Sequence, residues 1–210
     1  GRPVEPFLTT MTMGDVAERT PMACWRATSV LPGDEASLSG IRQLFTEYND
    51  FLISVGCDIS LFQGFEQELA ALPGKYSKEN KGVLVLCSAC ANAAEVPMGP
   101  LLADFPSKDV SNILPGQPVA CIALRPLEGS IGEVKRLYVA PLARGQGLGE
   151  KLSGLILSAA RDFGYTKLRL DTLERLPAAV TLYSKKLGFR RIEPYGHCPL
   201  PDALFFEIDI

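Results

Sequence analysis

The amino-acid sequence predicts an α/β protein built on one mixed β-sheet with flanking helices. A strand-like apolar run, residues 132–139, precedes a glycine-rich segment. From Leu148 to Phe163 apolar residues then recur at steps of three and four, the period of one helix face. A further strand-forming run, residues 167–171, follows this helix. A strand, a crossover helix and a parallel strand form a right-handed βαβ unit. The remaining predicted strands can pair antiparallel, which gives a mixed sheet.

The remaining strands are predicted from short runs of apolar and β-forming residues bounded by turn-forming residues. These runs are residues 24–30, 81–87, 118–124, 189–193 and 203–210. Two helices are expected between the first two strands. Apolar residues from Ile41 to Leu52 follow the helical period, and Ser60 can cap a second helix that ends at Pro73.

The chain of 210 residues is long enough to bury the core of one domain. Residues 1–22 show no sustained period and include several prolines, so we expect an N-terminal tail or arm. Residues 23–210 then form one domain. Within it, residues 91–117 are rich in proline and are predicted to be a long insertion loop. Such a loop could cover an acceptor site, mediate association, or be a tolerated insertion.

The charge and hydropathy patterns exclude several classes of function. A net charge of −3, without any Lys/Arg cluster longer than a pair, argues against a nucleic-acid surface. No apolar run approaches the ~20 residues of a membrane span, and the N-terminal residues lack a basic-then-apolar signal pattern. We therefore expect a cytoplasmic monomer or homodimer that binds neither nucleic acid nor membrane.

The cysteines predict neither a disulfide nor a metal site. All stand in apolar contexts, and residues three apart on a strand, such as Cys87 and Cys90, point to opposite faces. Small buried side chains are therefore favoured over a bonded or metal-binding pair. No His, Cys or Asp cluster has convincing ligand spacing, so no metal is predicted.

The glycine-rich segment Arg144-Gly145-Gln146-Gly147-Leu148-Gly149 lies where the long helix begins. Its bare backbone lets the N–H groups of the first helical turn approach an anion, and the helix dipole favours negative charge there. This arrangement predicts a phosphate-binding site. A P-loop requires Lys after the last glycine, where Glu150 stands, and a dinucleotide fingerprint requires G-x-G-x-x-G. The segment fits neither pattern.

The segment does fit the pattern (Gln/Arg)-x-x-Gly-x-(Gly/Ala), filled by Arg144, Gly147 and Gly149. With the flanking segments 133–139 and 182–189, the chain resembles the GNAT superfamily of acyl-CoA-dependent N-acyltransferases. The resemblance covers residues 24–210. It implies a mostly antiparallel sheet in which the fourth and fifth predicted strands, residues 132–139 and 167–171, are parallel. These two strands would be splayed apart around the pantetheine arm of acetyl-CoA. The cofactor-binding residues that it implies are Leu137, Tyr138, Val139, Arg144, Gly145, Gln146, Gly147, Leu148, Gly149 and Tyr183.

Two residues are candidates for proton transfer. The resemblance places Glu133 where it could accept the amine proton, directly or through a water, and the alternative is a solvated carboxylate. Tyr183 matches the superfamily tyrosine that faces the thioester sulfur and would be the general acid, whereas the alternative is a ring packed on the core. The chain has one residue more before Leu187-Gly188-Phe189 than the usual Leu-Tyr-x-x-Leu-Gly-Phe spacing, and the helix end could absorb it.

The acceptor amine requires a pocket of its own. Asp171 and Thr172 end the fifth predicted strand and are candidates to line this pocket, although Asp171 could instead cap the following turn. The resemblance places Phe62, Tyr195 and His197 around the acceptor. His197 is the only histidine, and it is either a surface residue or a group for proton transfer near neutral pH.

The sequence thus predicts an N-acetyltransferase that moves an acetyl group from acetyl-CoA to the primary amine of a small molecule. The amine would attack directly in a ternary complex. One alternative is a protein lysine or N-terminal acetyltransferase, which would need an open groove. Another is a non-catalytic acyl-CoA-binding sensor, and the presence of Glu133 and Tyr183 argues against it.

Overall fold

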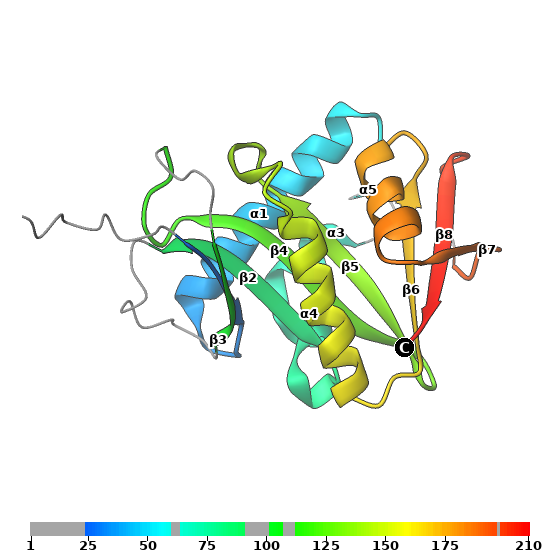
Figure 1. The fold of residues 1–210 in the computed structure, drawn as a ribbon, viewed down its shortest axis with the longest axis horizontal. Coiled ribbons are helices and arrows are strands. Elements are labelled where there is room, and N and C mark those ends of the chain that lie inside the picture. Colours follow the sequence, from blue (N-terminus) through cyan, green and yellow to red (C-terminus); the bar gives the residue numbers. More distant parts are fainter. Residues whose placement is uncertain (1–23, 60–63, 91–100, 107–111, 197) are drawn as a thin grey trace, which may run out of the picture.

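The computed structural model describes residues 24–59, 64–90, 101–106, 112–196 and 198–210. In these residues eight strands form one sheet, in the order β3-β1-β2-β4-β5-β6-β8-β7 (Figure 1). The strands are β1 (Cys24–Ser29), β2 (Val83–Cys90), β3 (Leu101–Pro106), β4 (Pro118–Glu128), β5 (Ile131–Val139), β6 (Lys167–Leu173), β7 (Arg190–Ile192) and β8 (Ala203–Asp209). Neighbouring strands are antiparallel except for β5 and β6, which are parallel. The predicted fold class is confirmed.

Helices cover both faces of the sheet. They are α1 (Glu35–Ser54), α3 (Phe65–Ala70), α4 (Leu148–Asp162) and α5 (Pro177–Thr181), with short 3₁₀ turns at Gly74–Tyr76, Lys78–Asn80 and Pro141–Ala143. Figure 1 shows α4 across one face of the sheet and α1 across the opposite face. Successive side chains of β4 point to opposite faces of the sheet and contact both helical layers. Ile122 packs in the hydrophobic cluster with α4, whereas Cys121 and Ala123 pack in the cluster with α1.

The parallel pair β5 and β6 is short and then diverges. Its ladder joins Ile131, Gly132 and Glu133 to β6 and ends there, and Figure 1 shows the two strands separating toward α5. A β-bulge follows on β5, where Arg136 and Leu137 together lie opposite the single residue Ile122 of β4. A bulge bends its strand and increases the local twist. The splay of the fourth and fifth predicted strands is therefore confirmed, and in the structure they are β5 and β6.

Arg136, at this bulge, has a backbone conformation that L-residues avoid. Its φ is +58°, in the left-handed region, which costs about 1–2 kcal/mol for a residue with a Cβ. The Arg136 side chain is buried and donates through Nε to Glu68 Oε1 of α3 at 2.7 Å. The guanidinium also lies over the rings of Phe45 and Phe65. These contacts anchor the bulge to the helical layer on the α1 face.

Two organisational predictions need correction. Residues 91–117 are not all loop, because Leu101–Pro106 forms strand β3 and pairs antiparallel with β1 at the edge of the sheet. The pairing is reinforced by an ion pair between Arg26 of β1 and Asp104 of β3, at 2.8 Å. The second predicted helix is shorter than expected, since α3 begins at Phe65, after Gly64 in the left-handed conformation. Ser60, Phe62 and the predicted tail 1–22 lie outside the described residues.

The prediction that Cys90 is a small unbonded side chain is wrong. Cys90 of β2 forms a disulfide with Cys24 of β1, its direct partner in the antiparallel register. The spacing of Cys87 and Cys90 therefore did not indicate the disulfide, because the partner of Cys90 stands on a different strand. Disulfides persist mainly in oxidising compartments, which does not favour the cytoplasmic location expected from the sequence. In the part of the chain that is described, no helix has the length and apolar character to cross a membrane.

We predict that Glu68→Gln destabilises the fold by about 3–5 kcal/mol at pH 7, because it leaves the charge of Arg136 buried without its partner. Burial opposes ionisation of Glu68, but its bonds to Arg136 and Lys75 outweigh this and lower its pKa to about 2. Since this value lies below the unfolded pKa of about 4.3, the contribution is complete above that pH and is lost as the pH falls toward 2.

Urea denaturation at pH 7 and pH 3 measures both effects. Glu66→Gln, an exposed residue of the same helix, is the matched control and should change stability by less than about 0.5 kcal/mol. Equal stability losses for the two variants at pH 7 would contradict the anchoring role of Glu68.

Candidate active site

The glycine-rich segment forms an open turn at the start of α4. Gly145 and Gly147 have φ values of +77° and +76°, in the region that favours glycine, and Gly147 is the N-cap of the helix. A Cβ at either position would meet no atom within 4 Å, so the space beside the backbone is open. The first N–H groups of an α-helix have no partner within the helix and carry the positive end of its dipole. The turn can therefore bind an anion.

Side chains from distant parts of the chain hold this turn. Arg144 Nε donates to the Val139 carbonyl at the end of β5, at 3.0 Å, and the Arg144 guanidinium lies over the Phe51 ring. Trp25 of β1 is fully buried, and its indole N–H donates to Gln146 Oε1 at 3.0 Å. The turn is thus fixed on one side by β5 and α1 and on the other side by β1.

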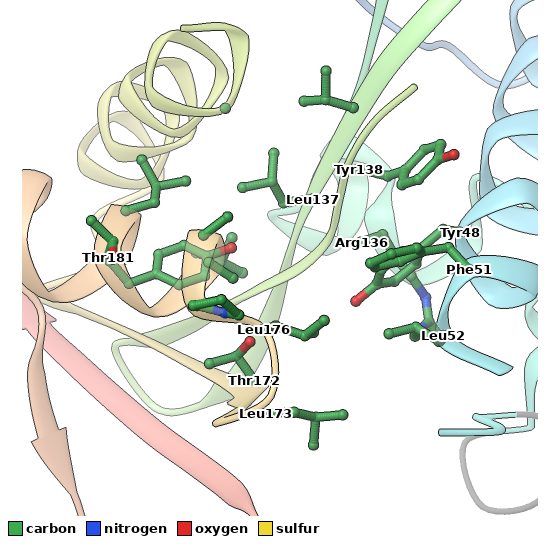
Figure 2. Close-up of a pocket in the computed structure, with 18 of the residues that line it drawn as sticks. Tyr48, Phe51, Leu52, Arg136, Leu137, Tyr138, Thr172, Leu173, Leu176 and Thr181 are labelled. Carbon is green, nitrogen blue, oxygen red and sulfur yellow. The ribbon is translucent and has the colours of Figure 1, made fainter. Parts of the chain in front are cut away.

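A cavity of about 810 Å³ lies between the diverging ends of β5 and β6 (Figure 2). Figure 2 shows Leu137 and Tyr138 of β5, Thr172 and Leu173 of β6, and Tyr48 and Phe51 of α1 around this space. The wall also includes Arg144, Gly145, Gly147, Leu148 and Gly149 of the glycine turn, together with Val139, Asp171 and Tyr183. The cavity therefore connects the anion-binding turn with the ends of both strands.

Several predicted residues do not line this cavity. Gln146 stands between two wall residues, Gly145 and Gly147, but its side chain is bonded to Trp25. Glu133 and Tyr195 are also absent from the cavity wall. His197 and Phe62 lie outside the described residues. The predicted cofactor residues are thus brought together except for Gln146. Of the predicted acceptor residues that the structure describes, Asp171 and Thr172 line the cavity and Tyr195 does not.

The Glu133 carboxylate is buried and is already bonded on both oxygens. Oε2 accepts from Arg125 Nε at 2.6 Å, and Oε1 accepts from the Tyr195 hydroxyl at 3.0 Å. Arg125 and Glu133 stand directly opposite each other in the β4–β5 ladder. Lys135, which lines the cavity, has its Nζ 3.8 Å from Glu133 Oε1. The geometry therefore does not present Glu133 to a substrate, and its role as a base stays a prediction.

Asp171 is the carboxylate that does line the cavity near the end of β6. Its Oδ1 accepts from Lys135 Nζ at 2.7 Å. Burial opposes ionisation of Asp171, but the charge and hydrogen bond of Lys135 outweigh it and lower the pKa of the carboxyl. Asp171 is thus ionised at neutral pH and can attract a cation.

Tyr183 lies on a π-helical turn, Leu182–Lys186, that follows α5. The turn is closed by a bond from the Leu187 N–H to the Leu182 carbonyl, five residues back, at 3.0 Å. A π-turn accommodates one extra residue in a helix, which is how the chain absorbs the additional residue before Leu187. Tyr183 is buried at the cavity wall, and burial raises the pKa of its hydroxyl. The hydroxyl therefore remains protonated and can act as a donor.

The sequence analysis did not identify the contribution of α1 to the site. Tyr48, Phe51 and Leu52 line the cavity, although their spacing is that of an ordinary core-facing helix. Arg175 was also missed. Its guanidinium pairs with Asp202 and donates to the carbonyls of Val55 and Gly56, which fixes the turn after α1 against the end of β6. Only the tertiary arrangement distinguishes these residues from core and surface residues.

Comparison with known proteins agrees with this geometry. Residues 100–189 match the acetyltransferase (GNAT) family. An uncharacterised N-acetyltransferase from Schizosaccharomyces pombe is 40% identical over 96 residues, which cover 45% of this chain and 58% of that protein. The GNAT-family acetyltransferase structure from Staphylococcus aureus has a TM-score of 0.62 at 15% identity and covers 88% of this chain and 98% of that one. Residues 100–189 are thus similar in sequence to the acetyltransferase (GNAT) family, and the fold of the chain is like that of a solved acetyltransferase of that family.

A second solved structure of similar fold contains a bound cofactor. It is yncA from Salmonella typhimurium with its cofactor acetyl-CoA, at a TM-score of 0.56 and 16% identity, with 87% of this chain and 93% of that one covered. The chain spans 58%, 61% and 48% of the lengths of three curated relatives that it matches. These relatives thus extend beyond the matched region.

We predict that the bond between Trp25 and Gln146 stabilises the glycine turn. In a double-mutant cycle, Trp25→Phe and Gln146→Leu should show a coupling energy of about 0.5–1.5 kcal/mol, the net value of one intramolecular hydrogen bond. Urea denaturation followed by circular dichroism measures it. The control cycle pairs Trp25→Phe with Gln43→Leu, an exposed residue of α1 bonded to Glu47, and should be additive. Additivity in both cycles would show that the bond contributes nothing.

Proposed function

We propose that this chain is an acetyl-CoA-dependent N-acetyltransferase that acts on the primary amine of a small molecule. The observation that carries the proposal is the continuity between the anion-binding turn and the cavity between β5 and β6. The diphosphate of CoA suits the open glycine backbone, and the pantetheine arm suits the apolar cleft beside Leu137 and Val139. The acetyl-CoA complex of the yncA neighbour supports this ligand choice.

The residues of the cleft can meet the needs of direct acyl transfer. The amine nitrogen bonds to the acyl carbon, the carbon–sulfur bond breaks, the amine loses a proton and the leaving thiolate gains one. Asp171, ionised and at the cavity wall, pairs with the ammonium form, accepts one proton from it and releases that proton to solvent, which leaves the free amine to attack. Tyr183, whose hydroxyl is kept protonated by burial, protonates the thiolate and is reprotonated from solvent. Atoms and charges balance without a covalent intermediate on the protein.

The distribution of the wall residues favours a small acceptor over a protein. α1, β6 and α5 contribute wall residues on several sides, as Figure 2 shows for Leu52, Leu173 and Thr181. A protein lysine or N-terminal substrate would need an open groove. A sensor that binds acyl-CoA without turnover would need neither Asp171 nor Tyr183 at the wall. A screen for free CoA thiol over small amines and peptide amines separates these alternatives.

We predict that Gly147→Val raises the CoA dissociation constant at least a hundredfold, because a branched side chain is strained at φ +76° and enters the space meant for phosphate. Isothermal titration calorimetry measures it. Gly154→Ala, an exposed position in the middle of α4 with open space for a Cβ, is the control and should bind CoA as the parent does. A folded Gly147→Val protein with unchanged affinity for CoA would show that CoA does not bind at this turn.

The two carboxylates give contrasting predictions for catalysis. Asp171→Asn should lower kcat/KM by about 10²–10⁴-fold, the usual effect of losing a group that takes part in proton transfer. Glu133→Gln should have a smaller effect, because its carboxylate binds Arg125 and Tyr195 and not the cavity. Steady-state kinetics, with CoA affinity and thermal unfolding as folding controls, decide between them. A large loss for Glu133→Gln with normal turnover in Asp171→Asn would assign the base to Glu133.

A further inference from the structure

One end of the cavity has an apolar lining. Figure 2 shows Leu52 of α1 across the space from Leu173 and Leu176, at the end away from α4. These leucines share one hydrophobic cluster with two further wall residues, Ile59 and Leu200, and the wall also includes Val55, which follows Leu52 in the chain. Most come from the end of α1 with its following turn and from the end of β6 with its following turn. If CoA occupies the glycine turn and the cleft beside Leu137 and Val139, this end is the part of the cavity that remains for an acceptor.

The charged groups at this end are already paired. Asp171 bonds to Lys135 at 2.7 Å, and Arg136 bonds to Glu68 on the far side of β5. Arg175 is held by Asp202 and by two backbone carbonyls. In the described wall at this end, Asp171 is therefore the single carboxylate, and each cation has an acidic partner.

The remaining polar groups at this end are neutral. Burial, followed by the neighbouring Cys198, raises the pKa of the Cys57 thiol to about 11, so the thiol is uncharged at physiological pH. Thr172 offers a hydroxyl beside Asp171. A second ammonium on the acceptor, or a carboxylate, would be desolvated here without an oppositely charged group to receive it, which is unfavourable.

We propose that the acceptor is a primary monoamine with an apolar aliphatic or aromatic body. This inference rests on the proposed function. The single ammonium is held at Asp171 and Thr172, and the body lies among Leu52, Leu173 and Leu176. Diamines, polyamines, aminoglycosides and free amino acids are disfavoured because each brings a second charge to an apolar wall.

A matched series of six-carbon amines tests the proposal. Hexylamine, 1,6-diaminohexane and 6-aminohexanoic acid carry the same chain and differ only in the far end: methyl, ammonium or carboxylate. The release of free CoA thiol from acetyl-CoA gives kcat/KM for each. The kcat/KM of hexylamine should exceed both others by tenfold or more, since even one methylene group in an apolar pocket changes kcat/KM by about 10–200-fold and a buried unpaired charge is less favourable still. A value for either charged analogue equal to or above that of hexylamine overturns the proposal.

A substitution at Leu176 tests where the body lies. Leu176 is partly exposed and is the N-cap of α5, a position at which Asp is favoured, so Leu176→Asp should fold. It should lower kcat/KM for hexylamine tenfold or more and shift the preference toward 1,6-diaminohexane, with CoA affinity unchanged by calorimetry. Leu114→Asp, at a highly exposed leucine, is the control and should keep the parent preference. An unaltered preference in folded Leu176→Asp overturns the placement.

The failures of the two proposals are distinguishable. If the protein binds CoA but transfers no acetyl group to any amine, the proposed function fails and this inference fails with it. If it acetylates only peptide amines, or charged analogues better than hexylamine, acetyl transfer stands and the apolar acceptor is overturned.

Discussion

The ion pair between Arg136 and Glu68 is the interaction on which the arrangement of the site depends. Arg136 stands at a bulge with φ +58°, three residues after the last residue of β5 that pairs with β6. If β5 ran straight on, its edge could continue the ladder with β6 and close the space now occupied by the cavity. The buried pair with Glu68, between the Phe45 and Phe65 rings, offsets the backbone strain and fixes the direction in which β5 departs.

The bulge also explains how residues from distant segments meet. It turns the end of β5 toward α1, so that Tyr138 contacts Tyr48 and Arg144 lies over Phe51. It leaves the end of β6 free to carry Asp171 into the cavity and to connect through α5 to the π-turn with Tyr183. The glycine turn, the proposed acceptor end, Asp171 and Tyr183 thus share one opening in the sheet.

The parts of the fold that sequence reasoning predicted correctly are those with strong local signals. The glycine turn and α4 follow from a helical period that begins within the glycines, and the extra residue before Leu187 was visible as a departure in spacing. The parts that it missed depend on register. Arg125 binds Glu133 only because the β4–β5 ladder sets them opposite each other, and the bulge at Arg136 changes that ladder. Cys24 and Cys90 are 66 residues apart, so their pairing likewise requires the β1–β2 register.

We propose that the opening between β5 and β6 is an acyl-CoA site with its phosphate end at the glycine turn. Backbone amide chemical shifts, followed by ¹⁵N NMR during titration with CoA, test it most directly. We expect the largest changes at the amides of Gly145 to Gly149 and of Leu137 to Val139. Saturable changes confined to other segments, with these amides unmoved, would contradict it.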